Sequence, residues 1–168
     1  MARRLDHPTP DPVGPGQESV WDYPRPPALV ASDEHVVIRL GDAVIADTRA
    51  SFKVLETSHP PTYYVPPGDV DQGLLRPASG SSFCEWKGMA SYFDVVVGDV
   101  VLPRAVWAYP TPSERFAAIA DHISCYPATL ECTVDGERVQ PQAGGFYGGW
   151  VTSKVAGPFK GTPGSEWW

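Results

Sequence analysis

The sequence of 168 residues has no long hydrophobic run and no excess of basic residues. No stretch approaches the roughly 18 consecutive apolar residues that indicate a membrane-spanning helix. Lys and Arg number 13 against 20 Asp and Glu, and the net charge of −7 disfavours binding to nucleic acid or anionic lipid. The one basic cluster, Arg3-Arg4, is not followed by the apolar segment of a secretory signal. We therefore expect a soluble cytoplasmic protein with no nucleic-acid or membrane partner.

Cysteine is scarce, with only Cys84, Cys125 and Cys132, and none of them belongs to a Cys-x-x-Cys pair. A disulfide-rich secreted domain favours an even number of cysteines, and a structural zinc site favours paired ones. The four histidines are dispersed and show no spacing typical of metal ligands. We therefore expect reduced thiols, no metal site and no cofactor.

Turn-forming and aromatic residues, by contrast, are abundant. The 19 Pro and 16 Gly together make 35 residues, about a fifth of the chain, against roughly 12% in an average protein. This content excludes a helical bundle. Short β-rich runs recur between Pro or Gly clusters, which is typical of an all-β sandwich or barrel. The length fits one domain with extensions.

Individual elements can be predicted from local patterns. Gly41-Asp42 and Gly98-Asp99 each separate two β-rich runs, which predicts two hairpins with II′-like turns. Ser113 is predicted to cap a short helix over 113–120, with Phe116, Ala117 and Ala120 on one side. Further strands are predicted at 51–57, 62–65, 124–127 and 130–134. One helical turn is predicted at 69–75, capped by Asp69, and a loop over 79–82.

The chain divides into three predicted segments: a proline-rich arm (1–31), a β domain (32–140) and a Gly/aromatic tail (141–168). In the arm, Trp21-Asp22-Tyr23-Pro24 carries enough apolar area to dock, either on the body or on a second copy of the chain, which would form a homodimer. The aromatic residues of the tail favour a segment that packs on the domain over a free linker.

Four motifs, in order, resemble the domain-of-unknown-function 427 family: HPPTYYVPPGDV from His59, CEWKGMASY from Cys84, WAYP from Trp107 and CYP from Cys125. The resemblance covers about residues 36–138, and the arm and tail resemble extensions found in part of the family. It implies a mostly β, β-tent-like small domain of two antiparallel sheets that meet at an angle, with one or two short helices. Many β-tents bind zinc at their apex through Cys-x-x-Cys pairs, so this zinc-free chain would hold its apex by apolar packing. The family has carried a nucleotidyltransferase label, but the sequence has no glycine-rich phosphate loop followed by Lys-Ser or Lys-Thr.

Four residues are candidates for catalysis. Cys84 would be a nucleophile if a nearby cation, Lys87 or His59, lowered the pKa of its thiol, although a free cysteine also serves as a small core residue. Alternation along the strand places Glu56 on the core side, as an acid/base or as half of a buried pair with Lys87 or an arginine. His59 precedes two prolines and is either catalytic or a hydrogen-bonding strand cap.

Aromatic residues recur at the predicted strand ends. Together with a few polar groups, they predict a pocket for a planar or cationic small molecule, although each of them could equally fill the core. The predicted ligand-binding residues are Tyr63, Tyr64, Trp86, Tyr92, Trp107, Tyr109 and Tyr126.

The function expected from the sequence is small-molecule binding, with enzymatic activity through Cys84 and Glu56 or His59 as a further possibility. The alternative is a non-catalytic ligand-binding or protein-interaction module whose pocket is covered by its own arm or tail. In the extreme case Trp21-Asp22-Tyr23 or Trp167-Trp168 would fill the pocket.

Overall fold

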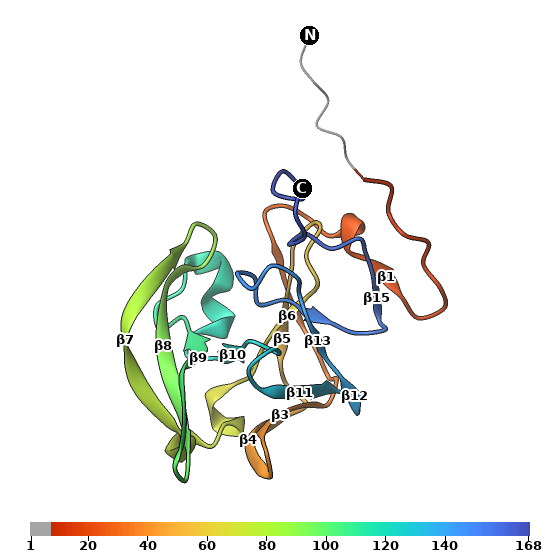
Figure 1. The fold of residues 1–168 in the computed structure, drawn as a ribbon. Helices are drawn as coiled ribbons and strands as arrows, with labels where there is room; N and C mark the ends of the chain where they lie inside the picture. The colour runs from red at the N-terminus through yellow and green to blue at the C-terminus, as the bar shows by residue number, and fades with distance from the viewer. Residues whose placement is uncertain (1–7) are drawn as a thin grey trace.

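The computed structural model describes residues 8–168. Arg3-Arg4 and the beginning of the arm lie outside the described residues. Figure 1 shows a mostly β molecule, which confirms the predicted fold class. No helix in the described part is long and apolar enough to cross a membrane.

Three antiparallel sheets form the body. The first sheet has the order β10-β9-β8-β7, the second β12-β11-β3-β4 and the third β2-β5-β6. The first comprises β7 (Leu75–Cys84), β8 (Gly88–Val97), β9 (Val100–Ala108) and β10 (Ile123–Cys125). The second comprises β3 (Val36–Leu40), β4 (Ala43–Thr48), β11 (Glu131–Val134) and β12 (Glu137–Arg138). The third comprises β2 (Ala28–Ala31), β5 (Phe52–Leu55) and β6 (Thr62–Tyr64).

Both predicted hairpins are present. Leu40 pairs with Ala43 across Gly41-Asp42, and Val97 pairs with Val100 across Gly98-Asp99. The glycines have φ of +58° and +56°, whereas neither aspartate has a positive φ. This combination is the one expected for a II′ turn.

The largest core cluster joins the first and second sheets and includes Ile38, Val95, Val106 and Cys132, all completely buried. Trp150, from the tail, also has no exposed surface, and its indole Nε1 donates to the Cys125 carbonyl at 3.2 Å. Truncating a fully buried tryptophan to alanine costs about 3–5 kcal/mol. The tail therefore supplies part of the core.

The arm and the tail pack on each other. β1 (Glu18–Ser19) pairs in parallel with β15 (Val155–Ala156) and lies beside it in Figure 1. The indole of Trp21 donates to the Pro158 carbonyl at 2.9 Å, and its ring lies 5.5 Å from that of Trp168. A second short sheet in the tail pairs β13 (Gln140–Pro141) with β14 (Trp150–Val151).

The helical predictions need correction. Residues Glu114–Ile119 form a 3₁₀ helix, η4, and Ser113 does not cap it through its side chain, because its hydroxyl donates to the Trp86 carbonyl at 2.6 Å. The buried residues are Phe116 and Ile119, while Ala117 is exposed. Phe116 departs from helical backbone angles, with φ −109° and ψ 18°, so a kink interrupts the single regular helix that the prediction assumed.

Residues 67–74 likewise form two short 3₁₀ turns, η2 (Pro67–Asp69) and η3 (Gln72–Leu74), in place of one. The cap of η3 is Asp71, which accepts from the Gly73 amide at 3.1 Å. Asp69 instead accepts from the hydroxyl of Thr48 at 2.7 Å. The prediction of Asp69 as the cap was therefore wrong, because a contact from β4 competes for its carboxylate.

The predicted loop over 79–82 was also wrong, since these residues belong to β7. β7 is an edge strand, and its register with β8 shifts between Pro77 and Ser81. Gly80, at φ +89°, lies where a Cβ would meet the guanidinium of Arg104. A run of Gly and Ser normally indicates a turn, but an edge strand tolerates this composition at an irregularity.

Candidate functional site

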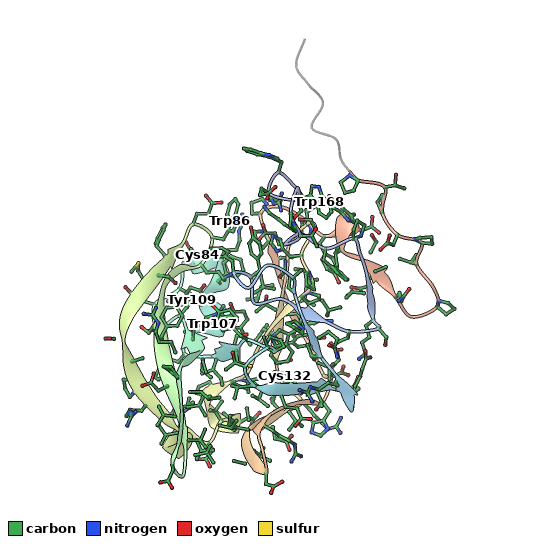
Figure 2. All side chains as sticks on the ribbon, in the orientation of Figure 1. Cys84, Trp86, Trp107, Tyr109, Cys132 and Trp168 are labelled. Carbon is green, nitrogen blue, oxygen red and sulfur yellow. The ribbon has the colours of Figure 1, made fainter. Side chains whose placement is uncertain are left out.

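A cavity of about 560 Å³ lies between the first sheet, the third sheet and the tail. Its lining comes from three parts of the chain: the end of β5 and β6, the β7–β9 hairpins with Tyr126, and tail residues 142–149 with Lys160. Figure 2 shows Cys84, Tyr109 and Trp107 along the first sheet. The volume falls in the range of about 300–1,000 Å³ that is typical of small-molecule sites. We call it the aromatic cavity.

The structure brings together ten of the eleven residues that the sequence singled out. They are Glu56, His59, Cys84, Lys87, Tyr64, Trp86, Tyr92, Trp107, Tyr109 and Tyr126. The exception is Tyr63, which follows Thr62 on β6 and whose hydroxyl donates to Glu34 at 3.1 Å in a different cavity. Successive residues of a strand face opposite sides, so Tyr63 and Tyr64 cannot line the same site.

Buried, mutually contacting aromatic side chains form the cavity wall on β6 and β9. The indole Nε1 of Trp107 donates to the hydroxyl of Tyr64 at 3.2 Å, and the Trp107 ring lies 4.7 Å from that of Tyr126. Tyr64 is 1% exposed and Trp107 is 8% exposed. Burial raises the pKa of Tyr64 and of Tyr109, so both hydroxyls stay protonated at neutral pH. The wall therefore offers ring faces and neutral hydroxyl groups.

The predicted nucleophile, Cys84, is the last residue of β7 and is half-buried with a free thiol. It packs with Trp86, Tyr92 and Tyr126 around the core cluster that includes Trp107. Lys87 places its ammonium over the Tyr109 ring, 5.6 Å from the centroid. Cys84 thus lies in the cavity wall among aromatic rings.

The polar end of the cavity is organised by His59 and Gln142. The side-chain oxygen of Gln142, Oε1, accepts a hydrogen bond from the Gly149 amide at 3.1 Å, which fixes the orientation of the side-chain amide. Its amide nitrogen then donates both to the Lys160 carbonyl at 2.7 Å and to His59 Nδ1 at 3.1 Å. Because Nδ1 accepts, the proton of the neutral imidazole is on Nε2, which lies 3.7 Å from Glu56.

The same surroundings keep His59 uncharged. Burial lowers the pKa of His59 to about 4, against the opposing effect of Glu56 and with help from Lys160 and Arg25. Glu56 itself pairs with Arg25 at 3.2 Å, one of the two partnerships predicted for it. Neither imidazole nitrogen is therefore left free to take a proton from a bound molecule.

Sequence reasoning missed the tail residues of the cavity, including Gln142, Tyr147 and Lys160. The sequence feature that could have indicated these residues is the Gly-Gly-Phe-Tyr-Gly-Gly run at 144–149. A Cβ at Gly148 would lie 2.5 Å from the Trp107 ring, and one at Gly149 would overlap Gln142 and Pro60. These glycines allow the backbone to approach the cavity wall closely, although the sequence alone does not say which wall.

The aromatic residues of the arm and of the C-terminus that could have filled the pocket lie outside it. Trp21, Tyr23, Trp167 and Trp168 are not among the residues that line the aromatic cavity. Tyr23 packs with Val20 and Val155, and Trp167 is 77% exposed. The tail forms one wall of the cavity and leaves its volume open.

A second cavity, of about 410 Å³, surrounds Glu34 on the opposite side of β6. Glu34 accepts from Lys154 at 2.7 Å, Lys53 at 3.0 Å, Ser32 at 2.8 Å and Tyr63. Burial alone would raise the pKa of Glu34, but the hydrogen bonds from Lys154, Lys53 and Ser32 lower it to about 2. We call this the Glu34 cavity, and the charge of Glu34 is already paired.

Within residues 8–168 there is no cluster of three or more His, Cys, Asp and Glu residues that could hold a metal ion. The carboxylates of the Asp69-Val70-Asp71 sequence are taken up by Thr48 and by the Gly73 amide. Cys125 and Cys132 are completely buried free thiols whose sulfur atoms lie 3.3 Å apart.

The fold and the site define a mostly β protein with an open cavity walled largely by aromatic residues. Residues 28–140, more than half of the chain, match the family model described as Domain of unknown function (DUF427). The chain belongs to the DUF427 family. No curated protein matches it.

Proposed function

We propose that this protein binds a small planar organic molecule in the aromatic cavity. The observation that carries the proposal is the combination of an open volume of about 560 Å³ with a wall of buried rings and a few polar groups. Pockets with this composition hold flat apolar ligands by stacking and orient them through a few hydrogen bonds. Trp107 and Tyr126 supply the stacking surface, and Thr62 and Lys87 supply polar contacts.

The experiment is a screen of planar metabolites by ligand-observed NMR, compared between wild type and Ala90→Leu. Ala90 is 2% exposed and lines the cavity, so a leucine at this position would fill part of the ligand volume. We expect the wild type to bind at least one ligand and Ala90→Leu to bind it about tenfold more weakly or worse.

Met89→Leu is the matched control, since the neighbouring residue is 50% exposed and does not line the cavity. It should bind like wild type. Equal binding by wild type and Ala90→Leu would place the ligand outside the aromatic cavity and overturn the proposal.

A second candidate is an enzyme in which Cys84 acts as nucleophile or redox thiol and Lys87 as its electrostatic partner. The observation in its favour is that both side chains line the same cavity as Glu56 and His59. The contacts of His59 with Gln142 and Glu56 favour a positioning role for it, which leaves Glu56 as the acid/base of this candidate.

The enzyme candidate predicts that iodoacetamide labels Cys84 faster than a model thiol at neutral pH, because a nearby cation stabilises a reactive thiolate. The label is measured by mass spectrometry of the intact chain. Cys125 and Cys132 are completely buried and provide an internal control that should not react in the folded protein. Labelling of Cys84 no faster than the model thiol would leave binding as the function.

A further inference from the structure

Protein cations already lie against three rings in or beside the aromatic cavity. Lys87 lies over Tyr109 at 5.6 Å, and Lys160 lies over Tyr147 at 5.8 Å. On β9, Arg104 lies over Tyr92 at 4.3 Å. A cationic ligand that approached these rings would meet positive charge, so the attraction that ring faces usually offer to cations is already used.

The carboxylates of the cavity do not reverse this preference. Glu56 is held by Arg25 at 3.2 Å and lies beside His59 Nε2. Glu85 is exposed to solvent, where water and salt weaken its field. Neither carboxylate presents an unscreened, unpaired negative charge to the interior of the cavity.

Lys87 is the cation left for a ligand. Within residues 8–168 no carboxylate lies within 4.0 Å of its ammonium group. Lys160 differs, because its ammonium donates to the main-chain oxygen of Trp168 at 3.3 Å. An ammonium held over a ring inside a half-enclosed cavity forms a stronger, charge-assisted hydrogen bond to a carboxylate than to a neutral oxygen.

We infer that the ligand of the aromatic cavity is a planar aromatic molecule with a carboxylate group. Its ring packs on the wall that contains Trp107 and Tyr126, and its carboxylate accepts from Lys87. The inference rests on the proposed function and adds the charge of the ligand. The net charge of −7 repels anions at long range, so local recognition by Lys87 is what makes an anion acceptable.

The test is calorimetric titration of the full chain with three indoles that share one ring and differ in charge: indole-3-acetate, indole-3-ethanol and tryptamine. We expect indole-3-acetate to bind about tenfold more tightly than indole-3-ethanol, and tryptamine to bind most weakly. In Lys87→Gln, indole-3-acetate should fall to the affinity of indole-3-ethanol, whose own affinity should not change. Lys160→Gln removes the other cation of the cavity and should weaken indole-3-acetate less than Lys87→Gln does. Arg138→Gln removes the same charge from an exposed side chain that does not line the cavity, and as the matched control it should change each affinity by less than about twofold.

The outcomes separate this inference from the proposed function. If indole-3-ethanol or tryptamine binds as tightly as indole-3-acetate, or if Lys87→Gln leaves the preference intact, the charge assignment is overturned while binding stands. A larger loss in Lys160→Gln than in Lys87→Gln overturns the assignment of Lys87. Failure of all three indoles to bind the wild type overturns both proposals.

Discussion

The two cavities lie on opposite sides of β6, and they differ in whether the charged group at their centre has a partner of opposite charge. In the Glu34 cavity, Lys53, Lys154, Ser32 and Tyr63 all donate to one carboxylate. In the aromatic cavity, the Lys87 ammonium has no carboxylate partner among the described residues, and the rings face open volume. A set of charges that satisfy one another ties segments together, whereas unsatisfied groups beside empty space are suited to hold a ligand.

Among the charged residues of the two cavities, Glu34 should have the largest effect on stability when it is replaced. Glu34→Gln removes the carboxylate that pairs with Lys53 and one of the two carboxylates that pair with Lys154, whose other partner is Asp135 at 2.5 Å. We expect a loss of about 2–3 kcal/mol in the free energy of unfolding, measured by urea denaturation, because the largely buried ammonium of Lys53 loses its carboxylate and the donors of Ser32 and Tyr63 lose a charged acceptor.

Glu131→Gln is the control for Glu34. Glu131 pairs with Arg138 at 3.1 Å on the surface, where side chains that are 40% and 58% exposed contribute little. Its loss should be below about 0.5 kcal/mol. If both variants lost the same stability, the Glu34 cavity would not be a structural tie.

The pH dependence of stability should separate the two cavities. The pKa of His59 is lowered from 6.5 to about 4, so the unfolded chain binds a proton that the folded chain does not, and stability falls as the pH falls from 6.5 to 4. The pKa of Glu34 is lowered from 4.5 to about 2, so its contribution is complete above pH 4.5 and is lost as the pH falls to 2. Each group contributes a slope of up to about 1.4 kcal/mol per pH unit.

The corresponding variants are reciprocal controls. His59→Gln should flatten the unfolding free energy between pH 6.5 and 4 and leave the lower window unchanged, and Glu34→Gln should do the reverse. Measurement of the unfolding free energy across both windows checks this. An unchanged slope in His59→Gln would mean that the imidazole is not kept neutral by its surroundings.

The smallest effect on stability is expected for Lys87→Gln. Its ammonium has only a ring contact to lose, and the free energy of unfolding should change by less than about 0.5 kcal/mol without ligand. Thermal unfolding gives this value directly. A loss as large as that of Glu34→Gln would show that Lys87 has a structural role and would remove the contrast between the cavities.

Local patterns predicted well where a short-range rule decides the outcome. The Gly41-Asp42 and Gly98-Asp99 turns formed as expected, because φ > 0 at the first turn residue is available to glycine and matches the twist of a hairpin. The errors came where a distant contact competed. The carboxylate of Asp69 accepts a hydrogen bond from Thr48, and the hydroxyl of Ser113 donates to the Trp86 carbonyl. The Gly-Ser run at 79–82 belongs to β7, which pairs with β8.

The candidate site could be predicted in part. The motif residues Cys84 and Trp107 lie together because they end β7 and β9, neighbours of the central strand β8. Strand alternation alone predicts that Tyr63 and Tyr64 face opposite sides of β6. The prediction of the pocket grouped all the aromatic residues together and did not apply this rule. The contributions of Gln142 and Lys160 could not be found, because 83 residues separate Gln142 from its partner His59.

The sequence by itself determined the β class and the hairpins, since turn geometry and strand alternation act within a few residues. Four short motifs carried the family resemblance. Only the tertiary structure decided which charges are paired. Glu34 and Lys154 are 120 residues apart and meet because the tail packs on the body, where β15 pairs with β1. Lys87 has no such partner, because none of the packed segments brings a carboxylate within ion-pairing distance of it in the described structure.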